Sequence, residues 1–470
     1  MRKALLLLTL LAAGIAGGNE LPDFGSVADT VLSKSRERQI GRGAMLQLRM
    51  AGVILDDPML TEYVSLLGSR LASQAHDGDH SFEFFVVNDD RINAFAMPGG
   101  FIGINAGLIL ASENESELAG VLAHEVAHVT QRHIARSIYD NQRNSIVSLA
   151  TMLAALVLGA AADVGGDAMA GIATASQAAV AQRQINFTRS NEQEADRIGI
   201  EVLASAGFDP SGMSSFFEKL SRRYGTSAQI IPEYLRSHPI SGARAAEARA
   251  RARNLPRVEN VDSFAYGLAK ARLRALTPST GEQAMADFAP REDSALPADR
   301  YGRALALTRI GLHDNAELIF RDLVANHPSI TAFRIGQAEA LFADNLTEQS
   351  MAVYEQALSL SPRNIPLTIS YAERLIAAGE AAEAHSVLLD LLNNVPPTPA
   401  QIQLIARAAN AEGDIAAAHS YMAEYYLSIG NLQLAISQLQ MALELPNVNG
   451  VDRSRFKARL DQIIEYLPDD

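Results

Sequence analysis

The sequence predicts a mostly α-helical protein in two parts, an α+β domain with a small sheet and an all-α solenoid behind it. Helical and strand-like apolar patterns alternate up to about residue 256, and a 34-residue period follows from about residue 298. The length of 470 residues suits two or three domains, and 48% apolar residues with no tryptophan suit helices with small interface residues.

The composition limits the partners and bonds that the chain can use. A formal net charge of −14 gives no electrostatic case for binding nucleic acid or anionic membranes. The chain has no cysteine, so disulfides and a lipoprotein anchor are excluded, and packing alone must hold the solenoid together. Any metal ligand must therefore be His, Asp or Glu.

Residues 1–18 have the pattern of a secretory signal peptide. Arg2 and Lys3 precede an apolar stretch at 4–13, and Ala16-Gly17-Gly18 offers a small-residue exit. The apolar stretch is too short to span a bilayer, so an uncleaved anchor is disfavoured. We predict export from the cytoplasm and cleavage of the signal.

The next segments predict two helices and two strands. Residues 35–75 are helical in pattern, and Asp57-Pro58 is a helix start. Residues 81–87 alternate and carry β-branched and aromatic side chains, which predicts a strand. Residues 101–110 are a second strand candidate, entered through Pro98-Gly99-Gly100.

A His-Glu-x-x-His motif at 124–128 lies on an apolar helix for which Ser112-x-x-Glu115 resembles a capping box. Residues four apart share a helix face, so His124 and His128 can bind one Zn²⁺. Glu125 lies further round the helix, where it can reach a metal-bound water. The alternative is a chance match to the motif, in which two histidines on the helix surface lie beside a solvated glutamate. Because buried histidines need partners, we interpret the motif as that of a zinc hydrolase.

The best source of a third ligand is the acidic segment 190–197. Glu192 and Asp196 share a helix face, whereas Glu194 points elsewhere. Glu192 can bind the metal while Asp196 orients an imidazole through its second nitrogen. An ordinary acidic first turn explains the same spacing, so both interpretations remain open here.

With these motifs in place, the chain resembles the Ste24/HtpX/Oma1 superfamily of zinc metallopeptidases. The resemblance rests on the His-Glu-x-x-His motif and on the Glu-x-x-Ala-Asp motif at 192–196, and it continues in the strand-and-turn stretch 93–108. Ser237-His238-Pro239 and Arg244 resemble an element of the soluble periplasmic branch, the β-barrel assembly-enhancing proteases. That branch joins a gluzincin-type domain to tetratricopeptide repeats. The resemblance covers about residues 35–460.

The resemblance implies a role for each site residue. His124, His128 and Glu192 would bind one Zn²⁺ per chain, and Glu125 would be the general base. His238 would occupy the fourth zinc position, displace the catalytic water and keep the enzyme latent. The alternatives for His238 are a capped loop histidine or a donor to the tetrahedral intermediate. Arg244 would either stabilise the oxyanion or pair with an acid.

Two further expectations concern access to the site. In gluzincin-type peptidases an edge strand beside the metal helix pairs with the substrate, and we expect 101–106 to be that edge. The uncharged run 146–162 and the Ala-rich stretch that follows it, to 181, predict an apolar lid or core helix. A membrane span is less favoured, because Ala and Gly make the run weakly hydrophobic. A lid that touches the outer membrane peripherally is the intermediate interpretation.

The C-terminal part repeats every 34 residues. Proline, turn and small-residue positions recur at this step, as in tetratricopeptide repeats. They are Pro328, Pro362 and Pro396; Gly311, Asn345, Gly379 and Gly413; Ala316, Ser350, Ala384 and Ala418. Four prolines between 256 and 297 predict a bridge between the domains. We expect a concave partner-binding surface, with stability or dimerisation as the plainer alternative.

These observations predict a periplasmic zinc metalloendopeptidase with four segments. They are a signal peptide at 1–18, a metallopeptidase domain at 19–256, a linker at 257–297 and a repeat domain at 298–470. The resemblance implies that the substrates are unfolded or stalled outer-membrane β-barrel proteins and that the barrel-assembly machinery is a partner. The rival function is a chaperone-like adaptor of that machinery with little proteolytic activity.

Overall fold

The computed structural model describes most of the chain between residues 32 and 465. The described ranges are 32–75, 81–140, 189–224, 232–256, 258, 262–291, 294–446 and 448–465. The predicted signal peptide at 1–18 and the predicted lid at 146–181 lie outside them. Within the described ranges, no helix combines the length and the apolar character that crossing a membrane requires.

Two N-terminal helices pack on opposite faces of a small sheet. Helix α1 (Lys34–Met50) is capped by Ser33, and α2 (Pro58–Ala72) begins at the predicted Asp57-Pro58 start, where the Asp57 side chain accepts from the Leu60 backbone N–H. Proline suits this first helical position because its missing N–H would have no partner there. Helix α2 packs against strand β1 (Glu83–Val87).

The sheet has three strands in the order β1-β3-β2. Strand β3 (Phe101–Asn105) runs parallel to β1 and antiparallel to β2 (Ala94–Met97). Gly99 and Gly100, with φ of 79° and 86°, make the tight turn that lays β3 along β2.

This arrangement corrects two predictions. The strand expected at 101–110 ends at Asn105, and the chain continues as helix α3 (Ala106–Ala111). The expected edge 101–106 is instead the buried centre of the sheet, because β3 is paired on both sides. A continuous apolar run does not distinguish a central strand from an edge strand followed by a helix. The edge strand that packs against the metal helix is β2.

Helix α4 (Glu115–Thr130) carries the His-Glu-x-x-His motif and is buried along its whole length. Its N-cap is Asn114, which accepts from the Glu117 backbone N–H, so the capping box expected at Ser112 is wrong. Ser112 ends α3 instead, and its hydroxyl donates to the Ile109 carbonyl. The helix therefore starts two residues later in the chain than Ser112 would place it.

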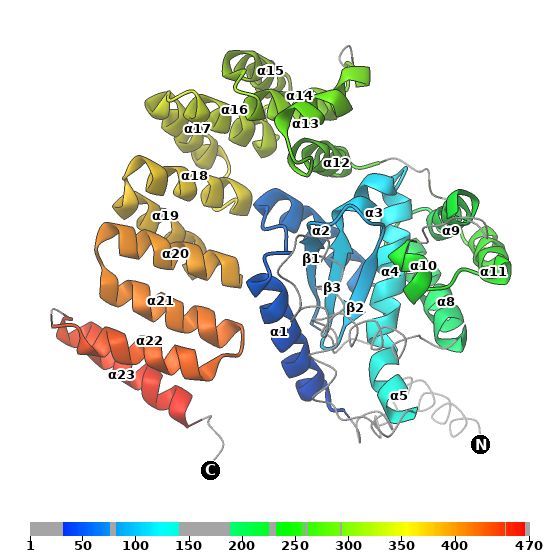
Figure 1. Cartoon of the computed structure of the whole chain (residues 1–470), viewed down its shortest axis with the longest axis horizontal. Coiled ribbons are helices and arrows are strands. Elements are labelled where there is room, and N and C mark those ends of the chain that lie inside the picture. The colour runs from blue at the N-terminus through cyan, green and yellow to red at the C-terminus, as the bar shows by residue number, and fades with distance from the viewer. Residues whose placement is uncertain are drawn as a thin grey trace, which may run out of the picture.

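Further helices follow α4 in the described part of this domain (Figure 1). They are α5 (His133–Asp140), α8 (Arg189–Ser205), α9 (Ser211–Tyr224), α10 (Glu233–Ser237) and α11 (Gly242–Arg253). Helices α8 and α9 pack against α4, and α11 packs on α8 and α9. Helix α8 lies along α4 because Gly199 has no side chain. A Cβ built there would lie 3.1 Å from the His124 backbone nitrogen. This close approach brings the acidic segment 190–197 against the motif.

The C-terminal helices form the predicted repeats, which curve as an arc beside α1 and α2 (Figure 1). We call α14–α23 the repeat arc. Its helices are α14 (Pro297–Arg309), α15 (His313–Asn326), α16 (Thr331–Ala343), α17 (Thr347–Leu360), α18 (Ile365–Ala378), α19 (Ala381–Asn394), α20 (Pro399–Glu412), α21 (Ile415–Ser428), α22 (Leu432–Glu444) and α23 (Gly450–Ile464). The predicted turn positions Gly311, Asn345, Gly379 and Gly413 all have positive φ. The predicted fold class is confirmed.

The expected linker 257–297 contains helices that pack against both parts. These are α12 (Phe264–Leu276), α13 (Gly281–Phe288) and a short 3₁₀ helix at Ala289–Arg291. Tyr266 and Leu273 of α12 belong to the core around the sheet, whereas Leu268 belongs to the first core of the repeats. Our domain boundaries remain a prediction, but the described part of this span is mostly helical.

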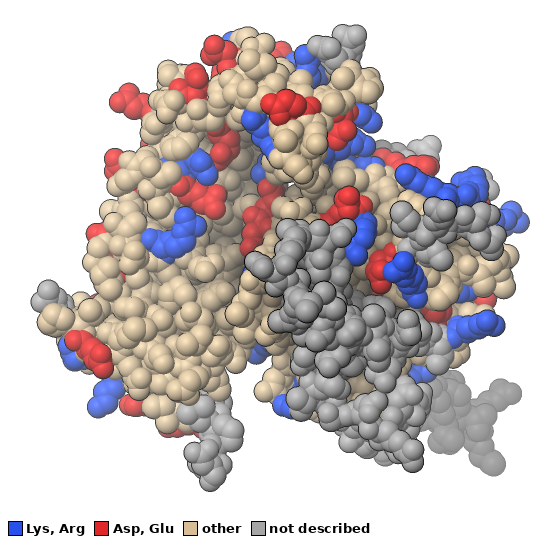
Figure 2. Space-filling view, in the orientation of Figure 1, with Lys and Arg blue, Asp and Glu red and all other residues tan. Residues whose placement is uncertain are grey.

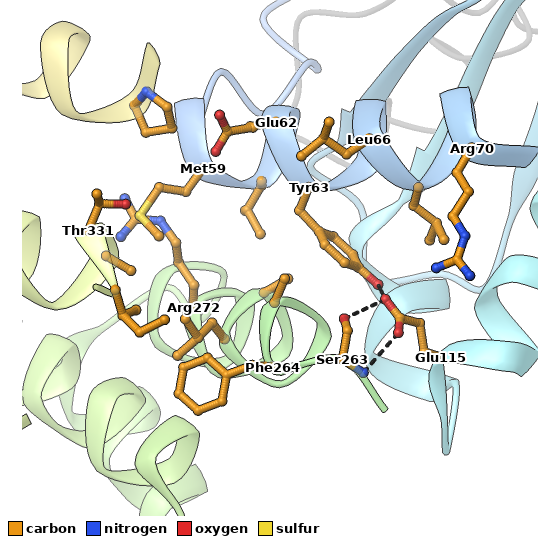
Figure 3. Close-up of a pocket in the computed structure, with 18 of the residues that line it drawn as sticks. Met59, Glu62, Tyr63, Leu66, Arg70, Glu115, Ser263, Phe264, Arg272 and Thr331 are labelled. Atoms are coloured by element: carbon orange, nitrogen blue, oxygen red, sulfur yellow. Dashed lines mark hydrogen bonds between the residues drawn. The ribbon is translucent and has the colours of Figure 1, made fainter. Parts of the chain in front are cut away.

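Polar contacts join the N-terminal α+β domain to α12 and the repeat helices, beside a pocket of about 460 Å³. Arg272 of α12 pairs with Asp57 at 2.7 Å and donates to the Tyr301 hydroxyl at 2.9 Å. In Figure 3, Ser263 and Tyr63 both bond to the Glu115 carboxylate, at 2.7 and 3.0 Å. Since Glu115 is the first residue of α4, the metal-motif helix is anchored directly to α2 and to the segment that leads into α12.

Candidate metal centre

Helix α4 and helix α8 bring three of the predicted ligands together. The Nε2 atoms of His124 and His128 lie 3.0 Å apart, one turn from each other on α4. The Glu192 carboxylate on α8 lies 3.5 Å from Nε2 of His124 and 3.3 Å from Nε2 of His128. All three side chains are buried. The acidic segment therefore faces the motif, as the metal interpretation requires.

The fourth predicted ligand, His238, completes the cluster from the end of α10. Its Nδ1 atom lies 3.0 Å from Glu192 Oε1 and 3.2 Å from His124 Nε2. The imidazole packs against the Tyr234 ring at 4.9 Å between centroids, and the following residue is Pro239. Proline restricts the backbone of the residue before it to extended conformations, and His238 has φ −123°.

The four donors lie close enough together to share one metal ion. Ligand bonds of about 2.0–2.1 Å in a tetrahedron separate the ligand atoms by roughly 3.3–3.4 Å. Five of the six pairs of residues have donor atoms 3.0 to 3.5 Å apart, with Glu192 using Oε2 toward His124 and Oε1 toward His128 and His238. One atom from each of the four residues can be chosen so that all lie within 4.8 Å of one another. Three imidazoles and one carboxylate are the donor types that zinc takes in catalytic sites.

The electrostatics of the cluster also suit a cation. Burial raises the pKa of the Glu192 carboxyl, but the adjoining His238, His124 and His128 hold that pKa well below its usual range. Burial lowers the pKa of His128 well below 6.5. Burial opposes protonation of His124 as well, yet the carboxylates of Asp196 and Glu192 raise its pKa to about 9. Glu192 thus stays charged in a buried site.

Glu125 is buried beside this cluster without a hydrogen bond among the described residues. Neither carboxyl oxygen has a hydrogen-bond partner, and the side chain is fully inaccessible to solvent. The Nε2 atom of His238 lies 3.4 Å from its Oε1. Buried carboxyl groups without partners are rare in structural roles, so this position suits a group that handles a proton.

Asp196 and Arg244 brace the cluster. Asp196 Oδ1 lies 3.0 Å from Nδ1 of His124, the nitrogen that faces away from the other ligands. Arg244 binds both Asp196 oxygens, at 2.7 and 2.8 Å, and its Nη1 lies 2.8 Å from Glu192 and from the Pro239 carbonyl. Arg244 therefore pairs with acids, and its guanidinium is fully engaged in this arrangement.

Sequence reasoning missed three residues at the site. His133 lies 2.8 Å from His128 through their Nδ1 atoms, and Glu194, which was set aside, contacts His133 Nε2 at 3.2 Å. Burial lowers the pKa of His133 to about 4. Tyr234 is also buried there, against His238. The available signal was a further histidine five residues after the motif.

Comparisons with known proteins agree with this geometry. The model of peptidase family M48 matches residues 58–252, and a tetratricopeptide repeat model matches residues 341–408. The beta-barrel assembly-enhancing protease of Escherichia coli K12 is 39% identical, over 69% of this chain and 68% of its own length. A Vibrio cholerae relative is 40% identical, over 66% of this chain and 64% of its own length. The mitochondrial metalloendopeptidase OMA1 of Arabidopsis thaliana is 32% identical, over 42% of this chain and 37% of its own length. The chain thus spans about two thirds of each bacterial relative.

Proposed function

Because the chain belongs to the β-barrel assembly-enhancing proteases, metalloendopeptidases of peptidase family M48, we propose that it cleaves misfolded or stalled outer-membrane β-barrel proteins. We place it in the periplasm, where such substrates pass. The observation that carries the proposal is the convergence of four ligand-type atoms next to a buried Glu125, whose carboxylate accepts no hydrogen bond from the described residues.

We assign one Zn²⁺ per chain to His124, His128, Glu192 and His238. The donor set, three imidazoles and one carboxylate within 4.8 Å of one another, supports zinc over Mg²⁺ or Ca²⁺, which prefer six or more oxygen ligands. When bound, the ion supplies Lewis-acid polarisation of the scissile carbonyl and acidifies a water in its open position. Asp196 holds the ring of His124 through Nδ1, which leaves Nε2 free to face the ion.

Glu125 is the proposed general base. It accepts a proton from the attacking water and returns that proton to the leaving amine. Its position one residue after His124 places the carboxylate beside the ligand set but outside it. Arg244 is a positioning residue in this account, because its donors already bind Asp196, Glu192 and the Pro239 carbonyl.

His238 is the proposed switch that keeps the enzyme latent. It fills the fourth corner of the donor set through Nδ1 and faces Glu125 through Nε2. Water and His238 compete for the same position, so cleavage requires the imidazole to leave. Arg244 helps to hold the closed form, since it binds the carbonyl of Pro239, the residue after the switch.

Strand β2 and the repeat arc are the proposed contacts for the polypeptide substrate and its assembly partners. Strand β2 pairs only with β3 in the described part of the sheet and packs against α4, so an extended chain can add to its other edge. The lower part of the repeat arc in Figure 2, around α20–α22, shows few charges. Leu434 and Met441 of α22 are 41% and 38% exposed, as a surface for apolar segments requires.

A cleavage assay with the metal-loaded protein tests the proposal. An outer-membrane β-barrel protein is supplied unfolded and, in a parallel sample, folded. We expect slow cleavage of the unfolded form alone, loss of cleavage with a chelator, and faster cleavage by His238→Ala. Capture of the unfolded protein without cleavage, even by His238→Ala at full zinc occupancy, would favour the adaptor function instead.

A further inference from the structure

The chain reverses sharply after the metal-motif helix and returns a third histidine, His133, to it. Arg132 has φ 51°, in the left-handed region that L residues rarely adopt. Its side chain is buried and donates to the Leu32 carbonyl at 2.5 Å and to Glu37 at 3.3 Å. Such a conformation persists where the surroundings hold it. The turn starts α5 at His133 and aims that imidazole at His128.

His133 connects His128 to an acid on α8. The two Nδ1 atoms of His128 and His133 lie 2.8 Å apart, and His133 Nε2 lies 3.2 Å from Oε2 of Glu194. Arg136, one turn along α5, donates to the same oxygen at 2.9 Å. The His133 side chain is fully buried, whereas Glu194 is 26% exposed.

Only one assignment of protons is compatible with a metal on His128. A nitrogen that binds a metal carries no proton, so Nε2 of His128 is bare and Nδ1 must be protonated. His128 Nδ1–H then donates to His133 Nδ1, which leaves the proton of His133 on Nε2. That proton is donated to Glu194. Each ring nitrogen of His128 and His133 thus has one role, and the Glu194 carboxylate is the last acceptor in this series of hydrogen bonds.

We propose that His133 and Glu194 are positioning residues that fix the ring and the tautomer of His128 for metal binding. The inference rests on the proposed metal site. His124 is held directly by Asp196, at 3.0 Å, but His128 is held through an intervening imidazole. Helix α8 thereby supplies three acids with separate tasks: Glu192 binds the ion, Asp196 orients the first histidine, and Glu194 orients the second through His133.

Zinc affinity, measured by competition with a chromophoric chelator, tests the proposal without using turnover. His133→Leu removes both hydrogen bonds and should weaken zinc binding by about 10- to 100-fold. His133→Asn retains an acceptor for His128 and a donor for Glu194, so it should restore most of that affinity. Glu194→Gln should give an intermediate loss, because the amide oxygen accepts more weakly than a carboxylate. Glu201→Gln, exposed on the same helix, is the matched control and should bind as the wild type does.

The outcomes separate this inference from the proposed function. Equal zinc affinity in His133→Leu and the wild type, or no recovery in His133→Asn, would overturn the positioning role. If His133→Leu does not fold, Glu194→Gln decides alone, because its side chain is partly exposed and replaceable; unchanged affinity there contradicts the proposal. A wild-type protein without zinc affinity would overturn the metal site itself. Circular dichroism of the metal-free proteins checks folding.

Discussion

The His238 imidazole lies between the proposed general base and a proposed metal ligand: its Nε2 lies 3.4 Å from the Glu125 carboxylate and its Nδ1 lies 3.0 Å from Glu192. The same side chain therefore covers the open corner of the donor set and the proposed base. Displacing His238 frees both at once, so a single movement would convert a closed site into a competent one. Pro239 and Arg244 hold the backbone that would have to move.

Glu125→Gln should abolish hydrolysis while leaving zinc in place. The substitution conserves volume but removes the base, and general-base catalysis contributes typically about 10²- to 10⁴-fold. Glu125 is outside the ligand set, so zinc content should not change. Both quantities are best measured in a His238→Ala background, where the site is open. Turnover that survives in the double variant would show that another group takes the proton.

Arg244→Lys should weaken zinc binding by about 10- to 100-fold, as loss of groups that orient metal ligands typically does. A lysine cannot reproduce the fork that binds both oxygens of Asp196, nor reach Glu192 and Pro239 at the same time. The matched control is Arg249→Lys on the same helix, which alters only an exposed pair with Glu218. Equal zinc affinities in the two variants would argue against the bracing role.

Lys270 should make the stability of the protein depend on pH above neutrality. Burial, helped by the charges of Arg274 and Lys219, lowers its pKa from 10.5 to about 8. Between these values the unfolded chain binds more protons than the folded one, so the free energy of unfolding rises with pH in that window. Below pH 8 Lys270 is protonated in both the folded and the unfolded protein, so it no longer makes the free energy of unfolding depend on pH.

The urea midpoint of the wild type should therefore rise, relative to that of Lys270→Met, as the pH increases from 8 to 10.5. The variant also loses the hydrogen bonds to the Ser112 carbonyl and the Tyr266 hydroxyl, so the slope, and not the absolute midpoint, is the test. Parallel midpoints for the two proteins across the window would contradict the assignment.

Local patterns predicted the parts of this protein that depend on local geometry. The shared face of His124 and His128 follows from helical spacing, and the turn positions of the repeats follow from a fixed period. The start of α2 at Asp57-Pro58 follows from capping chemistry. The position of His238 came from a family resemblance alone, because no local rule links a loop 110 residues downstream to the motif.

The features that were missed depend on tertiary structure. Whether 101–106 is a central or an edge strand depends on where β2 pairs, and β2 itself is only four residues long. The contact of His133 with His128 depends on a left-handed turn at Arg132, an arginine that gives no turn signal. The Ser112 hydroxyl, expected to cap α4, instead bonds to the Ile109 carbonyl and to the hydroxyl of Tyr266, 154 residues away, and Asn114 caps the helix.

The most direct test of the account is the turnover of an unfolded β-barrel substrate by His238→Ala and the wild type, with zinc content measured in both. If His238 is a switch, the variant keeps its zinc on His124, His128 and Glu192, gains an open position, and cleaves faster than the wild type. If His238 instead donates a hydrogen bond to the tetrahedral intermediate, the variant loses about 10²- to 10³-fold in turnover. Slower cleavage by the variant at equal zinc content would contradict the switch.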